Sequence, residues 1–487
     1  MARAKSHCAV LDCDGDFGAG WFVYVEITIG FSVAELIARE GLVAVVGLGQ
    51  TGLSAVRFLR QLGYAVSVFE RDPNAAGVRV LRERYPEVQL HTGEWDVRQL
   101  CEASQVLLSP GVPRAHPFIQ AALQQGVPVS GDVSWFARYA LRPIIAVTGS
   151  NGKSTVVSWL AHVLTAVGVE AQAGGNIGIP VLDLLSMPEP GVYVLELSSF
   201  QLESLEGMKP VVATVLNVSP DHMDRYDSVA AYTLAKQRIY RGAQHAVINR
   251  ADPLTQGLLA QTTRVQSFGL DVPDLGQFGL EIEDGERYLC RGATRLCSTR
   301  DLALKGDHHI CNALAVLAVV EAFGVPSEAV MASLKTFRGL PHRCQVAGSI
   351  NGVLCYNDSK GTNVGATIAA ITGLGPHHRC QGEPGLVLLL GGQGKGADFS
   401  ALIPAITAQV RAVVTFGESS AVLAEVLSGS VPVTTVLTLD DAFDVALGVA
   451  QAPGAVLFSP ACASFDQFRN FEDRGDRFMA LVAAVSA

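Results

Sequence analysis

The sequence has few charged residues and no excess of positive charge. Charged side chains make up 17% of the 487 residues, with 36 Lys and Arg against 46 Asp and Glu, so the net charge is −10. This low charge fraction, together with 49% hydrophobic residues, excludes an intrinsically disordered chain. An acidic balance gives no general attraction to nucleic acid or to an anionic membrane, so we expect neither as a partner.

Paired cysteines and long hydrophobic runs are also missing. The ten cysteines are scattered with no C-x-x-C pair, which indicates reduced thiols rather than a disulfide framework or a zinc site. The stretch Trp21–Val33 is only 13 residues long and contains Glu26, so it is too short and too polar to span a membrane. Acidic residues precede it at Asp14 and Asp16, so we expect no secretory signal. We therefore expect a soluble cytoplasmic protein, and we expect it to be a monomer.

Short hydrophobic strands alternate with helical segments from Leu42 onward. This alternation is typical of βαβ units with parallel sheets and predicts an α/β fold. The predicted strands are 43–46, 65–69, 106–108, 144–147, 193–197, 211–216, 246–248, 353–356, 387–390, 412–416 and 456–458, and the clearest helices are 155–167 and 401–410.

Proline and glycine cluster near 131–142 and near 338–342, which indicates domain boundaries. We predict a first domain over 1–131, in which 1–40 form an extension without a clear pattern. A central domain over 132–340 and a third domain over 341–487 follow.

The first glycine-rich loop is Gly47-Leu-Gly-Gln-Thr-Gly52, a G-x-G-x-x-G motif between a predicted strand and a helix. Its glycines allow a tight turn and let the backbone approach a phosphate at the helix N-terminus. Glu70 follows the next strand, where a ribose-binding acid is expected. Three interpretations stay open from these residues: a dinucleotide, another diphosphate such as a UDP-sugar, or a tight turn without ligand.

The second loop, Thr148-Gly-Ser-Asn-Gly-Lys-Ser-Thr155, has the chemistry of a P-loop. Backbone N–H groups would wrap phosphates, Lys153 would neutralise their charge, and Ser154 or Thr155 would bind Mg²⁺. Val147 stands where the standard motif has its first glycine, so this is a shorter form. The loop predicts an ATP site.

Acidic and histidine side chains follow the neighbouring strands. Glu196 lies at the end of the strand 193–197, and Asp221 and His222 follow the next strand. Carboxyl ends of parallel strands meet at one edge of a sheet, so these groups are expected beside the P-loop. Together with phosphate oxygens and water they could complete a Mg²⁺ shell.

Several sequence strings resemble the Mur ligases, and the resemblance extends over about 42–480. These strings are Gly149–Thr155, Gly174–Gly178, Glu196–Glu203, Asn217–Tyr226, Asn357–Lys360 and Leu457–Ser464. The resemblance implies three domains: a Rossmann-like N-terminal domain that binds UDP, a central P-loop ATPase-like domain with a parallel sheet, and a Rossmann-like C-terminal domain that binds an amino acid.

The strings at 196–203 and 460–471 are most similar to the members that add D-glutamate to UDP-N-acetylmuramoyl-L-alanine. The implied reaction serves peptidoglycan precursor synthesis and uses ATP and Mg²⁺, with two ions expected. The substrate carboxylate becomes an acyl phosphate, which the amine of D-glutamate then attacks.

The resemblance also implies roles for individual residues. Catalysis would involve Lys153, Glu196, His222 and Lys236, where CO₂ would convert Lys236 to a metal-binding carbamate. The metal ligands would be Ser154, Thr155, Glu196, His222 and carbamylated Lys236. ATP would contact Gly149, Ser150, Asn151, Gly152, Lys153, Ser154, Thr155, Asn312, Arg343 and Asp358. The UDP-linked substrate would contact Gln50, Thr51, Arg71, Ser109, Asn176, Ser198 and Gln201, and D-glutamate would contact Lys360, Thr362, Lys395, Ser464 and Phe471.

Two departures from the family pattern affect these assignments. His309 stands where the family more often has Asn, and Arg71-Asp72 follow Glu70 where the family often has Thr-Arg. Turn and cap hydrogen bonds are the alternative role for Asn176, Ser198 and Gln201, and core packing is the alternative for Phe471.

Other functions stay open on the sequence. The nearest alternative is a different Mur-type ligase or a folylpolyglutamate-type ligase. The first glycine loop and Glu70 would also suit an NAD-binding oxidoreductase. A third alternative is a nucleotide-binding regulator without catalysis, but such a protein has no need of a metal shell.

Overall fold

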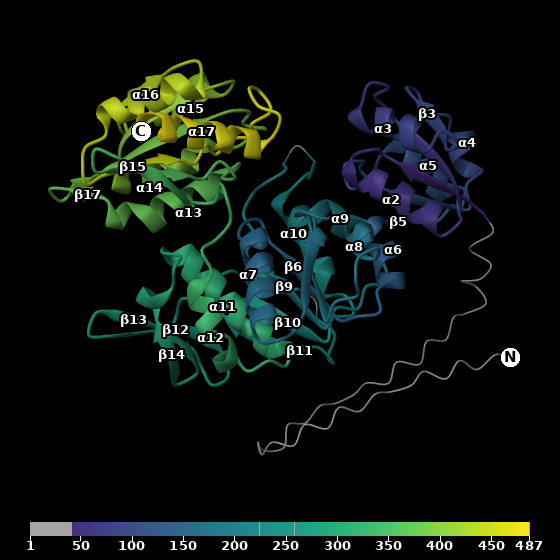
Figure 1. The fold of residues 1–487 in the computed structure, drawn as a ribbon, viewed down its shortest axis with the longest axis horizontal. Coiled ribbons are helices and arrows are strands. Elements are labelled where there is room, and N and C mark those ends of the chain that lie inside the picture. Colours follow the sequence, from purple (N-terminus) through teal and green to yellow (C-terminus); the bar gives the residue numbers. More distant parts are fainter. Residues whose placement is uncertain (1–40, 224, 258, 487) are drawn as a thin grey trace. The chain divides into compact units, whose positions relative to one another are not determined.

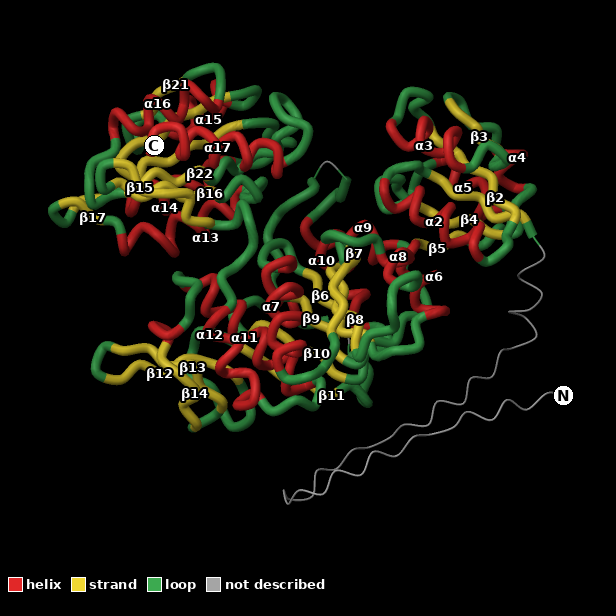
Figure 2. Tube along the Cα trace, in the orientation of Figure 1, coloured by secondary structure: helices red, strands yellow, loops and turns green. Residues whose placement is uncertain are grey.

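The computed structural model describes residues 41–223, 225–257 and 259–486 (Figure 1). Three sheets of mainly parallel strands follow one another along the chain, and helices cover them (Figure 2). The predicted extension over 1–40 lies outside the described residues. In the described ranges, no helix is long and apolar enough to cross a membrane.

The first sheet has five parallel strands in the order β3-β2-β1-β4-β5. Its strands are β1 (Leu42–Val46), β2 (Ala65–Glu70), β3 (Gln89–Thr92), β4 (Gln105–Leu108) and β5 (Val129–Gly131), and its helices are α2 (Gln50–Gln61), α3 (Ala76–Arg84), α4 (Val97–Cys101) and α5 (Pro117–Gln124). Val43 and Val45 of β1 pack in one core with α2 and α3, whereas Ala44 and Val46 pack in a second core with α4 and α5. Both faces are therefore buried, which explains the unbroken hydrophobic run of β1.

The second sheet has nine strands in the order β14-β13-β12-β11-β10-β9-β6-β8-β7. The strands are β6 (Ile144–Thr148), β7 (Ala171–Gly175), β8 (Val192–Glu196), β9 (Val212–Val215), β10 (His245–Asn249), β11 (Arg264–Phe268), β12 (Phe278–Glu283), β13 (Glu286–Arg291) and β14 (Thr294–Ser298). The strands from β7 to β12 run parallel, and the last three form antiparallel pairs.

Helices surround this central sheet. They are α6 (Asp132–Tyr139), α7 (Lys153–Ala166), α8 (Val181–Leu184), α9 (Ser199–Glu203), α10 (Val229–Gln237), α11 (Asp307–Ala322) and α12 (Met331–Thr336). The helices α7 and α11 lie side by side (Figure 1) and share a core with the sheet. Because every residue from Ala313 to Val320 is buried there, α11 is hydrophobic all round rather than on one face.

The third sheet has the order β15-β16-β22-β19-β20-β21, in which only the pair of β15 and β16 is antiparallel. Its strands are β15 (Gln345–Ile350), β16 (Val353–Asn357), β19 (Leu386–Gly391), β20 (Val410–Phe416), β21 (Val433–Thr435) and β22 (Ala455–Phe458). The helices are α13 (Val364–Leu374), α14 (Ile403–Gln409), α15 (Ser420–Leu427), α16 (Leu439–Val449) and α17 (Phe471–Ser486), and β17 (Arg379–Cys380) pairs with β18 (Glu383–Pro384).

Every strand predicted from the sequence is present, with ends that differ by one or two residues, and the two predicted helices correspond to α7 and α14. The strands that were not predicted are short or half exposed. For example, β13 carries Glu286, Arg287 and Arg291 and exposes part of its surface, so it lacks the hydrophobic run of a buried strand. The domain boundaries at 131/132 and 340/341 stay predictions.

Two glycines near the first loop have no room for a side chain. A Cβ on Gly52 would lie 2.0 Å from the carbonyl oxygen of Gly47, and a Cβ on Gly77 would lie 1.9 Å from that of Leu48. We expect Gly52→Ala and Gly77→Ala each to cost about 2 kcal/mol through overpacking. Thermal unfolding measured by calorimetry checks this result.

Gly49→Ala is the matched control, because no atom lies within 4 Å of its Cβ position. Gly49 is the N-cap of α2, so its replacement should cost at most about 1 kcal/mol. Equal stability of the Gly52→Ala and Gly49→Ala proteins would contradict the packing described here.

Candidate active site

The P-loop connects β6 to α7 by a turn that only glycine fits well. Gly152 has φ 83°, in the left-handed region, and a Cβ there would lie 2.7 Å from Oδ1 of Asn312 on α11. Lys153, the first residue of α7, folds back so that its Nζ donates to the carbonyl oxygens of Gly149 and Ser150, each at 2.8 Å. Burial lowers the pKa of Lys153, although Glu196 opposes this effect. A loop of this shape with a half-buried cation suits an anionic phosphate chain.

The loop after β9 supports the P-loop from one side. The backbone N–H of Asn151 donates to Oδ1 of Asn217 at 2.8 Å, and Nδ2 of Asn217 donates to the carbonyl of Asn151 at 3.0 Å. Oγ of Ser150 donates to the carbonyl of Ser219 at 2.9 Å and also lies 3.2 Å from the hydroxyl of Tyr232. The turn is thus held by the protein itself.

Glu196, the last residue of β8, lies directly beside the start of α7. Its Oε2 accepts from Oγ of Ser154 at 2.5 Å, and its Oε1 accepts from Nδ2 of Asn176 at 2.8 Å. Nη2 of Arg343 donates to the same Ser154 oxygen at 2.5 Å. Hydroxyl and carboxylate oxygens are the donors that Mg²⁺ prefers, so Ser154 and Glu196 fit this ion. Within the described ranges, no three His, Cys, Asp or Glu side chains gather into a complete metal site.

Lys236 on α10 is only 2% exposed. Its Nζ donates to the carbonyl of Gly149 at 2.8 Å and lies 4.4 Å from the centre of the Tyr232 ring. Burial, and next the positive charge of Lys153, lower the pKa of Lys236 well below its usual value. Both effects favour the neutral form of the amine, which is the form that reacts with CO₂.

One cavity of about 420 Å³, which we call the catalytic cavity, contains the predicted catalytic groups. It is lined by Lys153, Ser154, Glu196, His222 and Lys236. The P-loop therefore opens toward the acidic strand end and the histidine loop, as the sequence predicts. His222 lies at φ 58° and packs its ring edge-on against Phe200, with the ring centres 4.8 Å apart.

The residues predicted to bind D-glutamate line this same cavity: Lys360, Thr362, Lys395, Ser464 and Phe471. Lys360, Lys395 and Ser464 lie on the loops after β16, β19 and β22, which are neighbouring strands of the third sheet. Nζ of Lys360 lies 3.9 Å from the centre of the Phe471 ring, and burial lowers the pKa of Lys360 to about 8. Phe471 thus contacts the cavity and a cation rather than serving as core alone.

A second cavity, of about 430 Å³, lies on the other side of the P-loop. The predicted ATP residues on its wall are Asn151, Gly152, Thr155, Asn312, Arg343 and Asp358. His309 also lines it, and burial lowers its pKa, so its ring is neutral at pH 7. Thr155 lines this cavity but not the one that holds Glu196 and His222, so the structure brings only Ser154 of the two hydroxyls to the acidic strand end.

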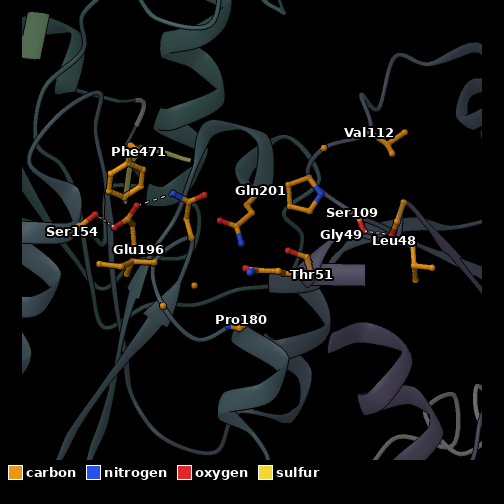
Figure 3. A pocket seen from close by; sticks show the side chains of 18 of the residues that line it. Leu48, Gly49, Thr51, Ser109, Val112, Ser154, Pro180, Glu196, Gln201 and Phe471 are labelled. Carbon is orange, nitrogen blue, oxygen red and sulfur yellow. Dashed lines mark hydrogen bonds between the residues drawn. The ribbon is translucent and has the colours of Figure 1, made fainter. Parts of the chain in front are cut away.

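The largest of these three cavities, about 1020 Å³, extends from the first glycine loop to Glu196. Gln50, Thr51, Arg71, Ser109, Asn176 and Gln201 line it, and Figure 3 shows several of these side chains together with Ser154 and Phe471. Ser198 instead lines the catalytic cavity and caps α9. Oε2 of Glu70 accepts from the N–H of Leu48 at 2.7 Å, so this acid shapes the loop itself.

Comparison with known proteins decides the family. Models described as "Mur ligase MurD-like, N-terminal domain", "Mur ligase middle domain" and "Mur ligase, glutamate ligase domain" match residues 41–131, 147–320 and 342–462. The UDP-N-acetylmuramoylalanine–D-glutamate ligase of Pseudomonas fluorescens is 47% identical over 452 residues, which cover 93% of this chain and 100% of the relative. The protein of that name from Pseudomonas aeruginosa is 46% identical over the same shares.

The chain belongs to the Mur ligase family. This confirms the predicted resemblance, the three-domain α/β fold and the prediction of an ATP-dependent ligase. Membership in the Mur ligase family favours a ligase over an NAD-binding oxidoreductase, the alternative that the first glycine-rich loop left open.

Solved structures support the same fold. The MurF ligase from Thermotoga maritima in complex with ADP has a TM-score of 0.59 at 16% identity. The superposition covers 92% of this chain and 95% of the MurF chain. The UDP-N-acetylmuramate-alanine ligase MurC from Thermotoga maritima has a TM-score of 0.56 at 20% identity and covers 91% and 100%.

Arg474 supports the loops of the site, and its role was not predicted from the sequence. This side chain is 0% exposed, and its guanidinium makes five hydrogen bonds. The acceptors are Oγ and the carbonyl of Ser359 and the carbonyls of Gly391, Cys462 and Ala463, at 2.8–3.4 Å. Burial lowers its pKa to about 10. Gly391 is the last residue of β19, and the other acceptors belong to the loops after β16 and β22, so one residue connects the ends of the three strands that lead to Lys360, Lys395 and Ser464.

Arg474→Met should destabilise the protein by about 3 kcal/mol or more, because it leaves several buried acceptors without donors. Calorimetric unfolding measures the loss. Arg477→Met is the matched control on the same helix, since Arg477 is exposed and pairs with Asp440; it should cost less than about 1 kcal/mol. A stability loss equal to that of the control would rule out the bracing role.

Proposed function

We propose that this chain is a cytoplasmic, ATP-dependent ligase that joins D-glutamate to UDP-N-acetylmuramoyl-L-alanine in peptidoglycan precursor synthesis. The observation that carries the proposal is the catalytic cavity, in which the P-loop, the acidic strand end, Lys236 and the predicted D-glutamate residues meet. The identity of 47% to a UDP-N-acetylmuramoylalanine–D-glutamate ligase supports this choice of substrate within the family.

ATP supplies a phosphoryl group that turns the substrate carboxylate into an acyl phosphate, so that an amine can form the amide. The chain must bring anionic groups together against their repulsion. Lys153 and Arg343 provide positive charge beside Ser154. The cavity of about 430 Å³, which would hold the nucleotide, and the catalytic cavity share lining residues there, among them Arg343. Asn312 on α11 closes the nucleotide side directly behind Gly152.

Mg²⁺, when bound, neutralises charge between the phosphates and the carboxylate. Ser154 and Glu196 offer oxygen ligands that already contact each other at 2.5 Å, and His222 lines the same cavity. A second ion would need a further anionic ligand, which a carbamate on Lys236 would provide. Thr155 lies on the nucleotide side, so we assign it to phosphate rather than to this metal.

Carbamate formation requires a neutral Lys236. In that state the Nζ lone pair attacks the carbon of CO₂, a N–C bond forms, one proton leaves to solvent, and the neutral amine becomes an anionic carbamate. The burial of Nζ near Lys153 favours the neutral amine, and the carbamate would remove a repulsion between the two lysines.

The two remaining substrates would contact different cavity walls. The UDP part would lie along the first glycine loop and Ser109, and its peptide end would reach Asn176 and Glu196 in the same cavity. D-glutamate would use Lys360, Lys395 and Ser464 for its carboxylates, and Phe471 would fix the orientation of Lys360.

Phosphate release by the purified protein tests the function. With ATP, Mg²⁺ and UDP-N-acetylmuramoyl-L-alanine, we expect release to depend on added D-glutamate and to yield the amide product. L-lysine, meso-diaminopimelate and L-glutamate serve as competing acceptors. Turnover with one of these and not with D-glutamate would show a different ligase of the family.

Lys236→Ala should lower kcat by about 10³-fold or more, a loss of about 4 kcal/mol of transition-state stabilisation. Small carboxylic acids should restore part of the activity if a carbamate is the missing group. Lys209→Ala is the control, because Lys209 is exposed. Full activity of Lys236→Ala would contradict the role of this lysine.

A further inference from the structure

A buried acid outside the motifs contacts the wall of the largest cavity. Asp132, the first residue of α6, is 1% exposed. Its Oδ2 accepts from Nε2 of Gln201 at 3.0 Å, and no second side chain among the described residues donates to the carboxylate; the backbone N–H groups of Asp132 and Val133 also favour its ionised form. Burial raises the pKa of Asp132 to about 6. Such a group costs stability, so its presence calls for an explanation.

The amide of Gln201 is nearly fully occupied by the protein. Its Oε1 accepts from the N–H of Ser198 at 3.1 Å and from Oγ of Ser198 at 3.3 Å. One hydrogen of Nε2 goes to Asp132, and no described protein group accepts the other. Gln201 lines the largest of the three cavities, and Figure 3 labels it. The second N–H of Nε2 is therefore the group of this amide that is available to a ligand.

Asp132 and the backbone N–H of Ser198 together fix which way this amide faces. An amide side chain can turn by 180° and exchange its oxygen and nitrogen. An ionised carboxylate only accepts hydrogen bonds, so Nε2 and not Oε1 must face Asp132. A neutral partner such as an amide could accept or donate, so only the N–H of Ser198 would then favour one orientation.

The connection between α6 and α9 does not depend on Asp132 alone. The N–H of Gly131 and Oγ of Ser134 both donate to the carbonyl of Ser204, at 3.3 and 3.1 Å, and the N–H of Glu206 donates to Oγ of Ser134 at 2.8 Å. These bonds hold the two segments together, so the buried charge of Asp132 has a purpose beyond bracing.

We propose that Asp132 is a positioning residue that locks the Gln201 amide as a hydrogen-bond donor to an acceptor oxygen of the UDP-linked substrate. This proposal rests on the proposed function only for the identity of that substrate. It names the chemistry of the contact: the substrate atom that meets Gln201 is a carbonyl, carboxylate, phosphate or hydroxyl oxygen rather than a donor.

Asp132→Asn tests the lock while keeping the shape of the side chain. We expect the KM and the calorimetric Kd for UDP-N-acetylmuramoyl-L-alanine to rise about tenfold, which corresponds to about 1.4 kcal/mol. The KM values for ATP and D-glutamate should change less than twofold. Ser134→Ala is the matched control, because it removes hydrogen bonds of the same connection without touching Gln201; it should lower the melting temperature and leave all three KM values in place.

A second variant pair separates donation from bracing. Gln201→Glu should lower the melting temperature, because two carboxylates then face each other in a buried position. Adding Asp132→Asn should restore the melting temperature, since the new amide can donate to Glu at position 201. The KM for the UDP-linked substrate should stay high in this double variant, because no N–H faces the cavity.

Three results would overturn the proposal: an Asp132→Asn enzyme with unchanged substrate KM, an equal rise of all three KM values together with a lower melting temperature, or a double variant with a restored substrate KM. A wild-type protein that releases no phosphate with UDP-N-acetylmuramoyl-L-alanine and D-glutamate would instead refute the proposed function. The two failures are therefore distinguishable.

Discussion

A half-buried lysine and a buried lysine share one carbonyl oxygen, and the rest of the site depends on this arrangement. Nζ of Lys153 and Nζ of Lys236 both donate to the carbonyl of Gly149 at 2.8 Å. Burial lowers the pKa of both groups, and the positive charge of Lys153 lowers the pKa of Lys236 further. An anionic ligand on the P-loop would relieve the repulsion between the two lysines, and so would loss of the positive charge on Lys236.

The carboxyl ends of parallel strands supply the groups that surround this pair. β6 leads into the P-loop, β8 ends in Glu196, and β9 leads to the loop of Asp221 and His222. In the third sheet, the neighbouring strands β16, β22 and β19 present Lys360, Ser464 and Lys395 in the same way. Arg343 then joins the two sets, because its guanidinium reaches Ser154 at the start of α7. Substrate groups held by different domains can thus meet at one point.

Much of the site could be predicted because each of its loops follows a hydrophobic strand. The runs that form β6, β8 and β19 are buried on both faces, so they read as continuous hydrophobic segments with the functional residues directly behind them. The half-exposed strands β13 and β15 could not be predicted in this way, since polar residues interrupt them. The supporting residues Asp132 and Arg474 were also missed, because a single acid or arginine on a helix usually lies at the surface.

The sequence by itself determined the order of strands and glycine turns, the chemistry of the P-loop and the set of charged groups that follow the strands. These features depend on neighbours along the chain. Only the tertiary structure decided which hydroxyl lines which cavity: Ser154 contacts Glu196, whereas Thr155 lines the cavity that contains Asn312. It also decided that Arg474 connects the ends of three strands. Adjacent residues on a helix point about 100° apart, and the partners of a buried polar group come from distant segments, so packing and not local sequence settles them.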